Sequence, residues 1–293
     1  MKLKHIKYIV LSASLLLTIQ ANALDFERYG GTFSMHGEIV EGDAIRFIAE
    51  LIQWDDPPTV FNITSMGGNL DEAMEIGRII RESQIPVWSW GECYSACVFI
   101  YVAGVERDSR GTIGLHRPYF ERKYFASLGS IEARKKYEEL KDVSVEYLKE
   151  MEVSQSIIER IFATDSTAAD ILDAEEANRI LGHRSPFYEE WLTAKCGKYT
   201  DEQQKVISSM AALRAARATI VVAKDDSLPK SDNFGGNIDE LVADAQLALQ
   251  MEGAGMLEPY KQLSKIHAEC ERKAVNSHVF GFHRSLKKYI LGQ

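Results

Sequence analysis

Short strand-like runs alternate with amphipathic helical segments in the part of the chain that follows Gly31. The runs are rich in β-branched and aromatic residues, whereas the segments between them carry apolar residues at helical spacing. The helical segment after the second run begins at Asn69, a good N-cap with Glu72 three residues on, which is a capping-box arrangement. The four runs span residues 32–35, 59–63, 87–90 and 112–115. Strands joined through helices by short connections form a mostly parallel sheet with right-handed crossovers. The sequence therefore predicts an α/β fold built from repeated β-α units.

The rest of the chain is dominated by helix-forming sequence. Residues 122–164 are charged and helix-forming, and Asp173 is placed to cap a short helix with Glu176 three residues on. Three further helices are predicted near the C-terminus, at residues 201–224, 238–251 and 258–273. We therefore predict an α/β domain over residues 24–185 and a helical C-terminal extension over residues 186–293.

The first 23 residues have the form of a secretory signal. Three lysines precede an apolar run from Tyr8 to Ile19, and Ala21-Asn22-Ala23 has the small-x-small form of a processing site. The apolar run is shorter than the about 20 residues of a membrane-spanning helix. We expect cleavage after Ala23 and a periplasmic or secreted protein, with an uncleaved N-terminal membrane anchor as the alternative.

The charge balance limits the partners of the protein. The chain has a formal net charge of −9, and cleavage after Ala23 would remove three lysines and no acidic residue, which gives −12. An acidic protein is poorly suited to bind nucleic acid or anionic lipid surfaces. We therefore expect no nucleic acid among its main partners.

Four cysteines in an exported chain favour disulfides. Cys196 and Cys270 both lie in the C-terminal third and form the natural pair. Cys93 and Cys97 flank Ser95, and the sequence leaves open whether they form a local bridge or pack as two buried thiols. A metal site is not predicted, because no Cys-x2-Cys pair with nearby histidines occurs in the sequence.

Ser95 lies between a predicted strand and a short apolar helix that Gly104 can close. A serine at such a turn has its hydroxyl at a helix N-terminus, where free backbone N–H groups favour developing negative charge. Acyl transfer needs this geometry. Taken alone, such a serine is more often an N-cap than a nucleophile.

Two further features fall at the same sheet edge as Ser95, because ligands of parallel sheets bind at the carboxyl ends of the strands. The pair Gly67-Gly68 follows the second predicted strand, and His116 follows the fourth. Taken alone, a Gly-Gly pair is more often only a tight turn before a helix, and a single histidine is more often a hydrogen-bonded structural residue than a base. Together with Ser95 they supply what nucleophilic catalysis needs. We predict Ser95 as nucleophile, His116 as general base, and backbone donors from Gly67, Gly68 and Ala96 for the oxyanion.

The order of these motifs resembles that of Clp protease proteolytic subunits, which belong to the ClpP/crotonase superfamily. The resemblance covers roughly residues 32–183 and rests on Gly37-Glu38-Ile39-Val40, Ser65-Met66-Gly67-Gly68, Tyr94-Ser95-Ala96 and Gly114-Leu115-His116-Arg117-Pro118. The Cys-x-Ser-Ala-Cys turn with an N-terminal signal is also similar to exported ClpP-like proteins described as predicted periplasmic proteins. The chain departs from the family at Met66, where proline is usual, and at Cys97, where glycine is common.

The resemblance implies a ClpP/crotonase-like fold, the roles given above for Ser95 and His116, and no cofactor. It also implies an aspartate that orients His116 and lies shortly before the helix start at Asp173. Asp170 is our choice, with Asp165 as the alternative, although the spacing does not match the family cleanly. The family's cores assemble into rings or other symmetric homo-oligomers, which the C-terminal helices could block or replace.

The leading hypothesis for function is an exported serine peptidase that works through an acyl-enzyme. Because an exported protein has no ATP supply, we expect no ATPase partner, and substrates that are peptides or unfolded chains. One alternative is a non-catalytic binding or assembly module with the same fold. The other is crotonase-like acyl-CoA chemistry, which export away from CoA disfavours.

Overall fold

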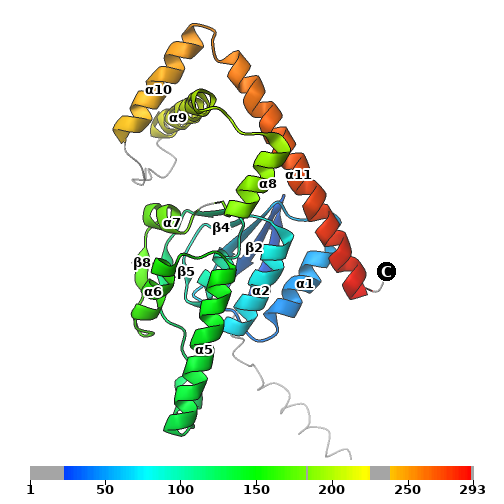
Figure 1. Cartoon of the computed structure of the whole chain (residues 1–293), viewed down its shortest axis with the longest axis vertical. Helices are drawn as coiled ribbons and strands as arrows, with labels where there is room; N and C mark the ends of the chain where they lie inside the picture. The colour runs from blue at the N-terminus through cyan, green and yellow to red at the C-terminus, as the bar shows by residue number, and fades with distance from the viewer. Residues whose placement is uncertain (1–22, 183, 225–237, 292–293) are drawn as a thin grey trace, which may run out of the picture.

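The computed structural model describes residues 23–182, 184–224 and 238–291 (Figure 1). Residues 1–22 of the signal-like segment therefore lie outside the described residues. Only Ala23, the last residue of the processing motif, is described. Among those that are described, no helix is both long enough and apolar enough to cross a bilayer.

The fold is mixed α/β, as predicted, and its larger sheet has the strand order β1-β2-β3-β4-β6. All neighbouring strands pair in parallel except β1, which runs antiparallel to β2. The strands are β1 (Asp25–Tyr29), β2 (Thr32–His36), β3 (Val60–Thr64), β4 (Val87–Ser89) and β6 (Arg107–Ser109). Three of the four predicted strands, β2, β3 and β4, thus lie in one mostly parallel sheet.

The fourth predicted strand lies in a second, smaller sheet, which the sequence did not indicate. This sheet has the order β5-β7-β8 and consists of β5 (Cys93–Tyr94), β7 (Ile113–Leu115) and β8 (Asp170–Leu172). β5 and β7 are parallel, whereas β8 runs antiparallel to β7. The small sheet carries the residues that precede Ser95 and His116, so it positions both.

Helices pack around the sheets and bury one main hydrophobic core. The short helix α3 (Ala96–Tyr101) is buried along its whole length. The other helices of this part are α1 (Asp43–Gln53), α2 (Leu70–Ser83), α4 (Arg122–Ala126), α5 (Ser130–Glu150), α6 (Gln155–Ala163) and α7 (Ala174–Ile180). The side chains of Phe33, Phe47 and Phe61 are fully buried and form mutual ring contacts between α1 and the sheet.

Helix α2 begins after the predicted N-cap Asn69, but the predicted capping box is only half formed. Asn69 caps the helix by accepting a hydrogen bond from the backbone N–H of Glu72 at 3.2 Å. The carboxylate of Glu72 does not fold back to complete a capping box. It accepts instead from the backbone N–H groups of Gly42 and Ala44, at 2.9 and 2.7 Å. One carboxylate thus satisfies unpaired donors at the N-terminus of α1 and ties α1 to α2.

The C-terminal region consists of α8 (Pro186–Cys196), α9 (Asp201–Lys224), α10 (Ile238–Gly253) and α11 (Glu258–Leu291). Figure 1 shows α9 and α10 next to each other and away from the sheets, and α11 running back beside α8 to α1 and α2. The helix predicted at 258–273 therefore continues to residue 291. The proposed boundary near residue 185 stays a prediction.

Helix α11 is held to α1 and α2 by hydrogen bonds to the C-terminal ends of these two helices. His278 lies 3.1 Å from the carbonyl of Glu82, near the C-terminus of α2. His283 lies 3.0 Å from the carbonyl of Leu51, and Lys287 donates to the carbonyl of Trp54, both at the C-terminus of α1. The last carbonyls of a helix lack partners within it. α11 therefore caps α1 and α2 from outside.

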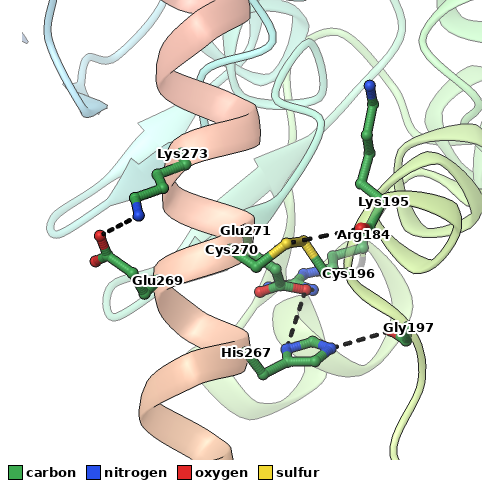
Figure 2. The surroundings of a disulfide bond; sticks show 9 residues. All are labelled: Arg184, Lys195, Cys196, Gly197, His267, Glu269, Cys270, Glu271 and Lys273. Atoms are coloured by element: carbon green, nitrogen blue, oxygen red, sulfur yellow. Dashed lines mark hydrogen bonds and ion pairs between the residues drawn. A yellow bond between two sulfur atoms is a disulfide. The ribbon is translucent and has the colours of Figure 1, made fainter.

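A disulfide between Cys196 and Cys270 joins α8 to α11, which confirms the predicted pair (Figure 2). Beside it, Arg184 forms ion pairs with Glu271 at 3.1 Å and with Glu106 at 2.8 Å. Because Glu106 directly precedes β6 of the larger sheet, these contacts link the C-terminal helices to the α/β part.

Candidate active site

Ser95 occupies a sharp turn between β5 and α3. Its backbone has φ 58° and ψ −125°, a conformation that residues with a side chain rarely adopt and that is held by the surrounding structure. The backbone N–H of Ser95 donates to the carbonyl of Gly114 at 3.1 Å. Although Ser95 lies at the N-cap position of α3, its side chain makes no capping hydrogen bond. The capping alternative therefore does not explain this serine.

The Ser95 turn is closed by a disulfide between Cys93 and Cys97. Both cysteines are fully buried. Of the two alternatives that the sequence left open for this pair, the structure has the local bridge. It joins the strand before Ser95 to the helix after it, on the side of the turn that faces the core.

The loop that contains Gly67 and Gly68 is hydrogen-bonded to the strand that leads to Ser95. The backbone N–H of Ser65 donates to the carbonyl of Glu92 at 2.9 Å, and that of Tyr94 donates to the carbonyl of Ser65 at 3.0 Å. Gly67 has φ 103°, and a Cβ atom there would lie 2.6 Å from the Cβ of Ser95. Only glycine fits this position, both for its conformation and for its space.

The two glycines differ in how their N–H groups are used. The backbone N–H of Gly67 donates to the hydroxyl oxygen of Ser65 at 3.0 Å, a local bond typical of serine in turns. Gly67 is buried, whereas Gly68 is exposed. Among the described residues, no hydrogen bond involves the N–H of Gly68 or that of Ala96. Gly68 and Ala96 are therefore the available donors, and the predicted role of the Gly67 amide stays a prediction.

His116 follows β7 and is partly buried. Its Nδ1 lies 3.0 Å from the backbone carbonyl of Arg117. Because a carbonyl oxygen can only accept, this contact places the proton on Nδ1 and leaves the lone pair of Nε2 available. That tautomer is the one in which a histidine can act as a base through Nε2.

The two aspartates considered as the third catalytic residue have arginine partners. The carboxylate of Asp170 accepts two hydrogen bonds from Arg160, which hold the pKa of Asp170 below its usual value. Asp165 accepts from Thr167 and Arg117, and these hydrogen bonds, those of Thr167 first, lower the pKa of Asp165. Within the described residues, neither carboxylate is hydrogen-bonded to His116. The assignment of Asp170 stays a prediction.

Asp165 is connected to His116 indirectly. Arg117, its ion-pair partner, donates its backbone N–H to the carbonyl of Thr164 at 3.1 Å, and its own carbonyl contacts His116. The segment after α6 therefore anchors the loop that carries His116. The sequence does not reveal this connection, because it depends on how the two segments meet.

A cleft of about 1050 Å³ brings the predicted site residues together. Five of them line it: Gly67, Gly68, Ser95, Ala96 and His116. Asp165 and Asp170 are not among the lining residues. No cluster of metal-ligating side chains is found in the part of the chain that the structure describes. The arrangement offers a hydroxyl, an imidazole and two backbone donors to a ligand in one hollow.

A scan of the sequence against protein-family models finds no match, and a search of curated proteins finds none. Among solved structures, the chain is similar to ClpP1 from Listeria monocytogenes, at 21% identity and a TM-score of 0.38, over 52% of this chain and 87% of that one. It is similar to the N165D mutant of that ClpP1 at 23% identity and a TM-score of 0.39, over 51% and 86% of the two chains.

Proposed function

We propose that this protein is an exported serine hydrolase, a peptidase that acts without ATP through an acyl-enzyme on Ser95. Its α/β part is proposed to have the ClpP/crotonase-like fold that its motif order resembles. The observation that carries the proposal is the Ser95 turn. A serine with a strained backbone and no capping bond lies against a glycine that admits no side chain, in a cleft that also holds His116. Strained residues of this kind cluster at active sites.

The proposed reaction begins when Nε2 of His116 accepts the proton of the Ser95 hydroxyl as its oxygen attacks a peptide carbonyl carbon. The N–H groups of Gly68 and Ala96 stabilise the negative charge that develops on the carbonyl oxygen. The C–N bond then breaks, and His116 returns the proton to the leaving amine. Water, deprotonated by His116, hydrolyses the acyl-enzyme and regenerates Ser95.

The two disulfides support an oxidising compartment. Since such a compartment outside the cytoplasm has no ATP supply, we expect no unfolding ATPase as partner, and substrates that are peptides or unfolded segments. A homo-oligomer is part of the proposal, and size-exclusion chromatography with mass detection measures it.

The test is labelling of the exported protein with a fluorophosphonate probe, which reacts with activated serines. We expect the wild type to be labelled, Ser95→Ala to be unlabelled, and the exposed Ser277→Ala in α11 to behave like the wild type. Absence of labelling in the wild type, or equal labelling of Ser95→Ala, would exclude the proposed chemistry.

The arginine partners of Asp165 and Asp170 favour a second candidate, a non-catalytic module that binds peptides in the same cleft. If His116 lacks a carboxylate partner also when substrate is bound, base catalysis is weakened. This candidate predicts peptide binding without probe labelling, and a biological activity that survives His116→Ala.

A further inference from the structure

We propose that the cleft around Ser95 selects peptides in which lysine or arginine residues flank an apolar residue at the scissile bond. This inference rests on the proposed function and specifies its substrates. The site is the cleft with its nucleophile, and the acidic residues discussed below determine which peptides enter it.

Four carboxylate side chains line the cleft, and they come from four separate segments. Glu38 follows β2, Asp71 lies in the first turn of α2, Glu92 precedes β5, and Glu121 lies at the N-cap position of α4. All four are exposed. As far as the described residues define the cleft, neither lysine nor arginine lines it.

Two of these carboxylates belong to segments that are connected to the Ser95 turn or to the glycine loop. Glu92 is three residues before Ser95, and its own carbonyl bonds the Ser65 amide of the glycine loop. Glu38 precedes Ile39, whose backbone exchanges hydrogen bonds with the carbonyl of Gly67 and the N–H of Asn69. Asp71 follows Gly68 by three residues, and Glu121 follows His116 by five. Negative charge thus lines the same cleft as the glycine loop, the serine turn and the histidine loop.

The four carboxylates have no partner among the described residues, neither in an ion pair nor in a side-chain hydrogen bond. Glu121, for example, makes no capping bond to α4. Several acidic residues outside the cleft are paired, as Asp170 is with Arg160 and Glu106 with Arg184. Like charges gathered in one cleft repel each other. A cationic ligand relieves this repulsion.

The cleft also has an apolar wall. Met66, beside Gly67, is 62% exposed, and Tyr119, near His116, is 57% exposed. Leu70, Phe99, Phe120 and Leu140 add further apolar lining. Apolar walls bind an apolar side chain and also lower the local dielectric, so that the field of nearby charges is concentrated in the cleft. The apolar wall and the four carboxylates together favour a peptide in which an apolar residue lies next to basic ones.

The test uses three quenched-fluorescence peptides that differ only in the residues flanking a central leucine, which are lysine, glutamine or glutamate. With the full exported protein at low ionic strength, we expect kcat/KM for the lysine peptide to exceed that for the glutamate peptide by at least about tenfold. The ratio should fall toward one in high salt, because the carboxylates are exposed to solvent. Equal rates, or a preference for the glutamate peptide, would overturn the inference.

Charge-neutralising variants locate the effect. Glu92→Gln and Glu121→Gln should each lower the lysine-to-glutamate ratio by about two- to fivefold, the effect of losing one exposed ion pair. Glu190→Gln is the matched control, since Glu190 is exposed on α8 and does not line this cleft. An equal change in the control and in the cleft variants would show that net charge, and not the cleft, sets the ratio.

Probe labelling separates failure of the inference from failure of the proposed function. If Ser95 is labelled and the peptides show no charge preference, only the inference fails. If Ser95 is not labelled, the proposed chemistry fails, and binding of the same peptides to Ser95→Ala by fluorescence anisotropy decides whether the cleft still selects basic ones. An equal affinity for the lysine and glutamate peptides would overturn the inference there too.

Discussion

The backbone of Gly67 lies against Ser95, so closely that a Cβ atom on Gly67 would come within 2.6 Å of the Cβ of Ser95. The same atom would lie 2.9 Å from the carbonyl oxygen of Tyr94 and 3.0 Å from the amide nitrogen of Ala96. These are backbone atoms of the small sheet and of α3, which cannot move without breaking the hydrogen bonds between the two turns. The position of the nucleophile and that of the glycine loop are therefore coupled.

Replacement of Gly67 by alanine should lower the rate of fluorophosphonate labelling by about 100-fold or more, the effect of misplacing the Ser95 nucleophile relative to the neighbouring oxyanion donor, the Gly68 amide. The added methyl group displaces the Ser95 turn or the loop, and φ 103° is unfavourable for alanine. Gly129→Ala is the control, because a Cβ atom there contacts nothing within 4 Å and φ is −69°. Labelling of Gly67→Ala at the wild-type rate would contradict the coupling.

The parts of the fold that follow from local sequence were predictable. Apolar residues at helical spacing and the capping residues Asn69 and Asp173 indicated α2 and α7, and both caps are present. β2 and β3 were indicated by β-branched and aromatic residues. The disulfide between Cys196 and Cys270 followed from cysteine positions alone.

Features that depend on distant partners were not predictable. β5 has two residues and β8 three, so neither leaves a period-two pattern, and both exist because β7 lies between them. The carboxylate of Glu72 serves α1 instead of its own helix, since the N-terminus of α1 lies within reach. The same limit applies at the site, where the contacts of Asp170 with Arg160 depend on how β8 packs beside α6.

The two disulfides should have separable effects. In the chain-entropy model the Cys196–Cys270 bridge, with a sequence separation of 74, stabilises the fold by about 4 kcal/mol. The Cys93–Cys97 bridge, with a separation of 4, contributes about 2 kcal/mol by the same model. We expect Cys196→Ala with Cys270→Ala to lower the free energy of unfolding and leave Ser95 labelling unchanged.

The double variant Cys93→Ala with Cys97→Ala should instead slow labelling, because the bridge closes the turn that carries Ser95. Urea unfolding and labelling rates on the same samples measure both effects, and each variant is the control for the other. Unchanged labelling without the Cys93–Cys97 bridge would show that the hydrogen bonds to Ser65 and Gly114 suffice to hold the turn.

Attachment of α11 should weaken as pH falls through the titration range of histidine. His283 is 4% exposed, and burial lowers its pKa in the folded protein. Above the unfolded value of about 6.5 the imidazole is neutral in both states, so its contribution is fully present there. Below that pH the unfolded chain binds the proton more readily, and stability is lost.

The charged groups that face His283 are Lys287 on α11 itself, and Asp56 and Arg28 in the α/β part. We expect urea unfolding midpoints to fall between pH 7.5 and 5.0, and to fall less in His283→Gln, whose amide can still donate to the Leu51 carbonyl but does not titrate. His267→Gln is the control, because His267 contacts Gly197 outside this interface. An equal pH dependence in His283→Gln and the wild type would contradict this prediction.

The two single variants Asp165→Asn and Asp170→Asn, compared side by side, show which aspartate acts on His116. Asp165 holds Arg117, whose carbonyl fixes the tautomer of His116, so Asp165→Asn should slow labelling about tenfold. Asp170 pairs with Arg160, which lowers its pKa. Its stabilisation is therefore present above the unfolded value of about 3.9 and is lost as pH falls below it. Asp170→Asn should mainly reduce this acid dependence in urea unfolding. If Asp170→Asn slows labelling and Asp165→Asn does not, Asp170 is the acid that orients His116, as the sequence predicted.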